Sequence, residues 1–285
     1  MSTLREKRKK ERRALRRRKT ADWTVVLILC AIAVCCGGYL IYHHWSVKQR
    51  ELEYEKLRQE ETLSAATETV IAEPETEENT EETVIYCDPV YDFGQLHEQN
   101  EDIYAWIVVP GTQVDYPLLQ SGTDNYYLDY NLYHSKGYPG CIYTNQCNRK
   151  DFSDYNTVLY GHNMKNGSMF GSIHSFEDET FFDEHPYIYV YTENERLTYE
   201  IYEAAKFTDV YIPSEYVISS KDDRDQFLTD VREKVSDNKL HVREDMEIGE
   251  EDRLITLSTC VSGERNHRYL VIGENLYHFP NFHKF

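Results

Sequence analysis

The chain has 285 residues, which is room for one domain of about 200 residues with accessory segments. Its charge is unevenly spread: residues 1–20 hold 11 of the 31 Lys/Arg and 2 of the 50 Asp/Glu, so 20 basic and 48 acidic residues remain for the rest. An acidic main body argues against nucleic acid as its partner, whereas 24 tyrosines favour strands and a well-filled core.

An uncharged apolar run extends from Trp23 to Tyr42. Its length matches the ~20 residues that a helix needs to cross the hydrocarbon layer of a membrane. The basic segment at residues 1–22 is expected to stay in the cytoplasm by the positive-inside rule, rather than to bind RNA. The sequence thus predicts a single-pass signal anchor in the cell membrane, with the rest of the chain outside. A cleaved signal peptide is the alternative, but the run is long for one and lacks a clean A-x-A site.

A charged segment follows the apolar run at residues 43–85. It is helix-prone up to about Leu63, and strongly acidic from Ser64 to Thr83. The acidic part cannot bury enough apolar surface to fold by itself. We therefore expect an extracellular stalk at 43–85 and one folded domain at 86–285.

The folded domain is expected to contain many short strands with helices between them. Residues 103–120 favour a strand, a Pro-Gly turn and a second strand. Further strands are predicted at residues 140–144, 157–160, 187–191, 197–207, 253–259 and 268–273. Helices are predicted at residues 92–100, at 125–133, after Gly167, and at 222–235. This pattern favours a small barrel or sandwich with helical insertions.

The cysteines do not form an extracellular disulfide framework. Three lie inside the apolar run, and the others are Cys87, Cys141, Cys147 and Cys260. No pair has the C-x-x-C spacing of a zinc or redox site, so we expect no metal and no cofactor, with Cys141 and Cys147 unpaired.

Three side chains are candidates for catalysis. Cys260 closes the apolar segment LITLSTC, and a thiol at a strand end is held rigidly yet meets solvent, as a nucleophile must. His162 follows the strand-like VLYG and opens a polar, Gly-rich loop, where it can exchange protons near neutral pH. Arg268 begins RYLVIG, which should pair with the cysteine strand and bring a permanent cation to the thiol. Singly, each has an ordinary alternative: a buried cysteine, a structural histidine and a surface charge.

Together these segments resemble the sortases. Residues 256–260, TLSTC, are similar to the T-L-x-T-C signature of that family, and YGHNMKNGSMFGSI at 160–173 resembles the histidine loop of its class B. Residues 100–120 and the helical insertion at 222–235 resemble further class B features. The resemblance covers roughly Tyr91–Gly273.

The resemblance implies a mainly β fold, a closed barrel of about eight strands with N-terminal helices and a helical insertion before the cysteine strand. It implies catalysis by His162, Cys260 and Arg268. Ser258 and Thr259 are expected near the substrate, and Tyr160 and Asn163 flank His162, where they would orient it or contact substrate. Arg265 lies in the same Cys260–Arg268 segment and stays open as the functional cation. The tail at 274–285 carries no functional expectation.

The implied activity is that of a cysteine transpeptidase, a thiol peptidase in the hydrolase class, in a Gram-positive cell. Cys260 would cleave a C-terminal sorting motif of secreted proteins after Thr, through a thioester. An amine of a peptidoglycan precursor such as lipid II would then accept the protein, which anchors it to the cell wall. The alternatives are a pilin-polymerising or mainly hydrolytic sortase and a membrane-anchored binding module without catalysis.

Overall fold

The computed structural model describes residues 2–68, 91–234 and 240–276. The chain divides into two compact units, Met1–Glu55 and Lys56–Phe285, each of which is described by itself. Three predicted parts lie outside the described residues: the stalk beyond residue 68, the last residue of the helix predicted at 222–235, and the tail beyond residue 276. The predicted domain boundaries therefore remain predictions.

The first unit is formed by helix α1 (Ser2–Glu68), which continues into the second unit. Its stretch Trp23–Gln59 has a window of mean hydropathy 2.5, none of which is buried within the protein. By length and composition this helix can cross a membrane. The predicted span at residues 23–42 lies within α1, which runs unbroken through both ends of that span.

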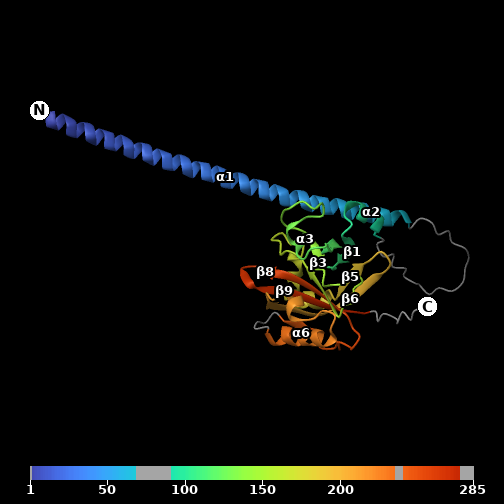
Figure 1. Cartoon of the computed structure of the whole chain (residues 1–285). Coiled ribbons are helices and arrows are strands. Elements are labelled where there is room, and N and C mark those ends of the chain that lie inside the picture. Colours follow the sequence, from blue (N-terminus) through green and yellow to red (C-terminus); the bar gives the residue numbers. More distant parts are fainter. Residues whose placement is uncertain (1, 69–90, 235–239, 277–285) are drawn as a thin grey trace, which may run out of the picture. The chain divides into compact units, whose positions relative to one another are not determined.

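The second unit is built on one closed β-barrel. Its strands are β1 (Ile103–Val108), β2 (Asp115–Leu119), β3 (Ile142–Thr144), β4 (Asn156–Tyr160), β5 (Tyr187–Tyr191), β6 (Arg196–Thr208), β7 (His241–Val242), β8 (Leu254–Val261) and β9 (Glu264–Asn275). They follow the order β5-β1-β2-β3-β4-β8-β9-β6-β7, and pairing of β5 with β6 closes eight of them into a ring (Figure 1). The predicted barrel of about eight strands is confirmed, and β7 is an addition at the edge of β6.

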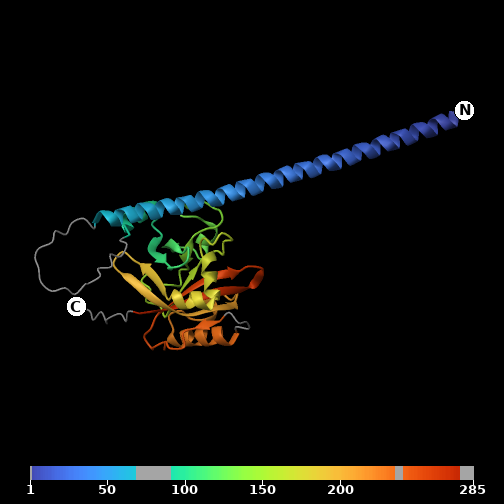
Figure 2. The ribbon, with the colours of Figure 1, turned by 180° about the vertical axis from the view of Figure 1, so that it is seen from behind.

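Short helices occupy both ends and one side of the barrel. They are α2 (Phe93–Gln99), α3 (Tyr126–Asp129), η1 (Gly171–Glu177), α4 (Glu179–Glu184), α5 (Ile212–Glu215) and α6 (Lys221–Lys234). In Figure 1, α2 and α3 lie at one end of the barrel and α6 at the other. The view from behind in Figure 2 shows the yellow segment of η1 and α4, where η1 contacts β6 and β9.

Helix α6 is the insertion predicted before the cysteine strand. Its apolar side chains recur at helical spacing, and Phe227 and Val231 are fully buried against Phe207 of β6 and Ile272 of β9. Acidic residues in its first turn and basic ones in its last complement the helix dipole. The helix is therefore stabilised by burial of one face against the barrel and by charged residues at its ends that complement its dipole.

The end of α1 that belongs to the second unit packs on the barrel. Leu57 is 3% exposed in a core cluster with Phe93 and Leu96 of α2. Arg58 Nε donates a hydrogen bond of 2.7 Å to the carbonyl of Asp115, at the start of β2. Both residues lie in the segment that the sequence assigns to a stalk, so packing against the barrel begins well before residue 86.

The expectation for the last strand is corrected. It begins at Glu264 rather than at Arg268, because β8 and β9 are joined by a tight turn at residues 262–263. Gly263 has φ +81°, a left-handed conformation that glycine adopts readily. Arg265 therefore lies on the strand and not in a loop. The other predicted strands all form, whereas β7 and α5 were not predicted.

Candidate active site

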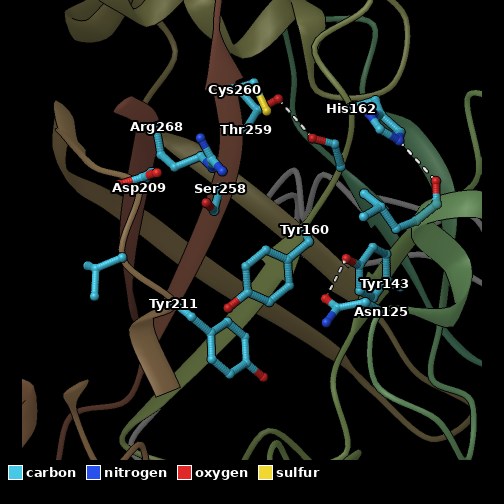
Figure 3. Close-up of a pocket in the computed structure, with 13 residues that line it drawn as sticks. Asn125, Tyr143, Tyr160, His162, Asp209, Tyr211, Ser258, Thr259, Cys260 and Arg268 are labelled. Atoms are coloured by element: carbon cyan, nitrogen blue, oxygen red, sulfur yellow. Dashed lines mark hydrogen bonds between the residues drawn. The ribbon is translucent and has the colours of Figure 1, made fainter. Parts of the chain in front are cut away.

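The β8–β9 hairpin brings Cys260 and Arg268 together. In β8, residues 254–259 are buried and Cys260 is exposed, so the strand supports a thiol that meets solvent. The antiparallel register places Arg268 directly opposite Cys260. The predicted pairing across this hairpin is confirmed, and both side chains line the same pocket (Figure 3).

His162 reaches that pocket from the neighbouring strand. Strands β4 and β8 are parallel, and Tyr160 is the register partner of Ser258, so His162 and Cys260 each follow the paired position by two residues. Two hydrogen bonds extend the pairing: Gly161 N donates to Ser258 O at 3.3 Å, and Thr259 Oγ1 donates to Gly161 O at 2.8 Å. The histidine and the thiol are thus placed by one continuous piece of sheet.

Glycine is needed between Tyr160 and His162. A Cβ at Gly161 would lie 2.5 Å from the Cδ1 of Ile142 and 2.7 Å from the ring of Phe170. Both neighbours are buried core side chains, which cannot give way cheaply. Because it has no side chain, Gly161 allows the chain to pass between Ile142 and Phe170 at the end of β4.

The ring of His162 is oriented by a main-chain acceptor. Nε2 donates to the carbonyl of Leu128, just inside the end of α3, at 2.9 Å. A carbonyl only accepts, so Nε2 holds the proton and Nδ1 is the basic nitrogen of the neutral ring. The ring of Tyr138 lies 4.8 Å from the imidazole, centroid to centroid. Sequence reasoning did not identify Leu128, because the contact comes from backbone and not from a side-chain type.

The pocket has a volume of about 320 Å³. Figure 3 shows Cys260, Ser258 and Arg268 on one wall, with the aromatic rings of Tyr160, Tyr143 and Tyr211 below them. The lining residues are Asn125, Leu128, Tyr143, Tyr160, Gly161, His162, Asp209, Val210, Tyr211, Ser258, Thr259, Cys260 and Arg268. A cavity that is mostly apolar, with a few polar groups aimed into it, suits a peptide side chain and its backbone.

The cation of the pocket is Arg268 and not Arg265. Arg268 Nη1 donates to its own strand, to the carbonyls of His267 at 3.0 Å and Arg265 at 3.3 Å. Asp209 lines the same pocket and is labelled beside Arg268 in Figure 3. Arg265 is exposed and is not among the lining residues.

Tyr160 forms part of the pocket wall. Its hydroxyl is buried and has no hydrogen-bond partner among the residues that the structure describes, and burial raises the pKa of this phenol far above its usual range. The rings of Tyr143 and Tyr211 lie 5.6 and 6.2 Å away, and burial also raises the pKa of Tyr211, to about 12. All the hydroxyls here are therefore neutral donors at physiological pH.

The remaining predicted site residues are divided between the pocket and its support. Ser258 and Thr259 both line the pocket. Asn163 does not line it: its amide donates to the carbonyl of Cys260 at 2.8 Å and to Ser262 Oγ at 3.2 Å. The hydrogen bond to the His162 ring comes from Leu128, whereas the Asn163 amide contacts Cys260.

Metal-binding side chains do not gather at this site. Among the residues that the structure describes, no group of three or more His, Cys, Asp or Glu is arranged to hold a metal ion. Cys141 is buried, with its thiol 3.5 Å from the carbonyl oxygen of Tyr130, and Cys147 is an exposed thiol.

Comparison with known proteins gives one consistent result. The family described as the Sortase domain matches residues 107–276. Sortase B of Listeria monocytogenes is 34% identical over 168 residues, 58% of this chain and 65% of that protein, so the chain spans slightly under two thirds of this relative. The crystal structure of Clostridium perfringens sortase B has 30% identity and a TM-score of 0.58, covering 65% of this chain and 100% of that one. A Staphylococcus aureus sortase B–substrate complex has 25% identity and a TM-score of 0.63, covering 81% and 98%.

Proposed function

Because the chain belongs to the sortase family and its relatives are class B enzymes, we propose that it is a membrane-anchored transpeptidase that joins secreted proteins to peptidoglycan. One observation carries the proposal. An exposed thiol, an oriented imidazole and a guanidinium, from Cys260, His162 and Arg268, line a single peptide-sized pocket. These are the groups that acyl transfer through a thioester requires.

The first half-reaction forms the acyl-enzyme. The Cys260 thiol gives its proton to Nδ1 of His162, and its sulfur attacks the carbonyl carbon of a Thr in the sorting motif and forms a C–S bond. The tetrahedral intermediate then collapses with cleavage of the peptide C–N bond. His162 gives its proton to the departing amine through the nitrogen that Leu128 does not occupy, Nδ1.

Arg268 has the electrostatic role in this scheme. Its guanidinium lies across the hairpin from the thiol and is always charged. It would donate to the carbonyls of the bound sorting peptide and stabilise negative charge as it develops on the scissile oxygen. The hydrogen bonds to its own strand carbonyls hold the head group at the pocket rim.

The second half-reaction releases the product. An amine of a peptidoglycan precursor such as lipid II attacks the thioester carbonyl, its proton passes to His162, and the C–S bond breaks to restore the thiol. Water in place of the amine would give hydrolysis. The ring of Tyr160 and the hydroxyl of Ser258 are suited to contact the acyl part, and Thr259 is suited to hold the pocket wall.

The anchor fits this reaction. We infer that the basic residues 1–22 stay in the cytoplasm and that α1 crosses the cell membrane once, which leaves the barrel outside. A substrate held in the membrane and a lipid-linked acceptor then share one surface with the enzyme. Tethering raises the effective concentration of each for the others.

The test uses the full-length chain in detergent with a panel of quenched sorting-motif peptides, with and without an amine acceptor. We expect cleavage that is lost in Cys260→Ala and His162→Ala, reduced at least 100-fold in Arg268→Ala, and kept in Arg265→Ala, its matched control on the same strand. Acceptor-linked product identifies the transpeptidase, and free acid alone identifies a hydrolase. If the folded chain cleaves none of the peptides and its Cys260 does not react with thiol reagents, the result would favour a binding module.

A further inference from the structure

A second histidine contacts the main chain of Cys260. His174 lies on η1, and its Nε2 is 3.1 Å from the carbonyl oxygen of Cys260. Its Nδ1 is 2.7 Å from Oε1 of Glu177, three residues further along, and its ring stacks on Tyr269 with centroids 4.9 Å apart and planes at 23°. The imidazole is thus held on three sides, and one of its nitrogens points at the proposed nucleophile's backbone.

The same carbonyl receives a hydrogen bond from Asn163. The amide Nδ2 donates to Cys260 O at 2.8 Å and lies 3.0 Å from His174 Nε2. Asn163 directly follows His162, so the two side chains on this carbonyl come from the histidine loop and from η1. The backbone of Cys260 is therefore tied to the segment that presents His162.

These side chains replace pairing that the sheet does not supply. The β8–β9 register is regular up to Cys260↔Arg268 and shifts between Cys260 and Val261. The carbonyl of Cys260 lies at this irregularity, where the ladder no longer determines the direction of the peptide plane. The side-chain contacts to this carbonyl come from Asn163 and His174.

Both protonation states of His174 keep the cluster connected. With Nδ1–H donated to Glu177, a neutral ring accepts from Asn163 through Nε2, and Asn163 also holds the Cys260 carbonyl. An imidazolium instead donates from Nε2 to that carbonyl while the Glu177 carboxylate balances its charge. In each state the cluster is a closed hydrogen-bonded network.

We propose that His174 is a positioning residue for the transpeptidase reaction. With Asn163 it fixes the peptide plane of Cys260, and so the direction in which the thiol enters the pocket; this rests on the proposed role of Cys260 as nucleophile. Attack on a carbonyl needs near-ideal alignment, and a displacement of about 1 Å can lower a rate by up to about 100-fold. Because Asn163 remains, loss of His174 alone should lower kcat by roughly 10-fold.

The test compares two variants of the full-length chain with the parent. His174→Phe keeps the ring on Tyr269 and removes both nitrogens, whereas His174→Gln keeps a donor of similar reach. We measure kcat and KM for sorting-peptide cleavage, the Tm, and the rate of Cys260 alkylation by iodoacetamide. For the Phe variant we expect kcat down about 10-fold, KM within about 2-fold and alkylation retained; the Gln variant should recover at least a third of the parent kcat.

Three results would overturn the inference: an unchanged kcat in His174→Phe, a Gln variant no better than the Phe variant, or a change confined to KM. If the Phe variant does not fold, Glu177→Gln takes its place, since it weakens the support of Nδ1 without altering the ring. An unchanged kcat in that variant also overturns the inference. Cys260→Ala separates the two proposals: an active Cys260→Ala refutes the function, while an inactive one beside a fully active His174→Phe refutes only the positioning role.

Discussion

Gly140 lies against the carbonyl that orients His162, so its replacement by alanine tests that contact. Gly140 has φ +71°, and a Cβ there would lie 2.3 Å from Tyr127 O and 2.6 Å from Leu128 O. Both are main-chain atoms of α3. To reach an ordinary contact of 3.4 Å, the Leu128 oxygen must retreat by about 0.8 Å. A retreat of this size lengthens or misaligns the 2.9 Å bond to His162 beyond a useful hydrogen bond.

The stability effect has two parts that a matched control separates. Gly263→Ala carries the same left-handed strain, with φ +81°, but its Cβ meets nothing within 4 Å. The strain alone costs about 1–2 kcal/mol. Gly140→Ala adds overpacking of about 1–3 kcal/mol, so its total is about 2–5 kcal/mol. At about 3 °C per kcal/mol, Tm should fall by roughly 10 °C against roughly 5 °C for the control.

The effect on activity is measured well below the melting temperatures of Gly140→Ala and Gly263→Ala. We expect kcat for peptide cleavage to fall about 10-fold in Gly140→Ala, with KM little changed, because the imidazole loses its orientation and not its pocket. Thermal unfolding followed by circular dichroism gives the stability difference. A Tm equal to that of Gly263→Ala, together with parent-like kcat, would refute both the clash and the role of the Leu128 carbonyl.

Three further predictions concern single side chains. Burial raises the pKa of Glu203 to about 7, so between its ordinary value of 4.5 and about 7 the native state keeps a proton that the unfolded chain has released. The free energy of unfolding should therefore fall by up to about 3 kcal/mol as pH rises from about 4.5 to 7. Urea unfolding at these two pH values should show this decrease, and a smaller decrease in Glu203→Gln. Thr259→Val leaves the Gly161 carbonyl without its 2.8 Å donor and should cost about 1–2 kcal/mol in the same urea assay, with a parent-like midpoint counting against it. Arg268→Lys keeps the charge but loses the planar fork, so kcat/KM should fall at least 10-fold; a parent-like value would mean that charge alone suffices.

Much of the barrel was accessible from local sequence patterns. The strands on either side of the Pro-Gly turn and the strand that ends in Cys260 are short apolar runs bounded by turn residues, and they form as predicted. The pairing of Cys260 with Arg268 follows from a hairpin of adjacent strands. Local patterns do not predict how the strands close into a ring, because β5 pairs with β1, which is far away in sequence.

The side chains proposed for catalysis could be selected from the sequence, whereas the contacts that support them could not. Cys260, His162 and Arg268 are distinctive residue types next to apolar strands. Leu128 acts through its carbonyl, which every residue has, and His174 is one of 11 histidines and lies just after the segment 160–173, which does not indicate its contact with Cys260. Such contacts depend on which loops the barrel brings together, which only the folded chain reveals.

The parallel register of β4 and β8 has a consequence for how this protein can diversify. Thr259 and Gly161 are 98 residues apart in the chain, yet they are joined by one hydrogen bond, and Cys260 and His162 follow directly after them. The intervening segment holds η1, α4, α5 and α6 together with strands β5, β6 and β7 of the same sheet, and α5 and α6 lie between β6 and β7. Changes in Asp209, Val210 and Tyr211, which line the pocket just before α5, can therefore alter its shape while His162 and Cys260 keep their places.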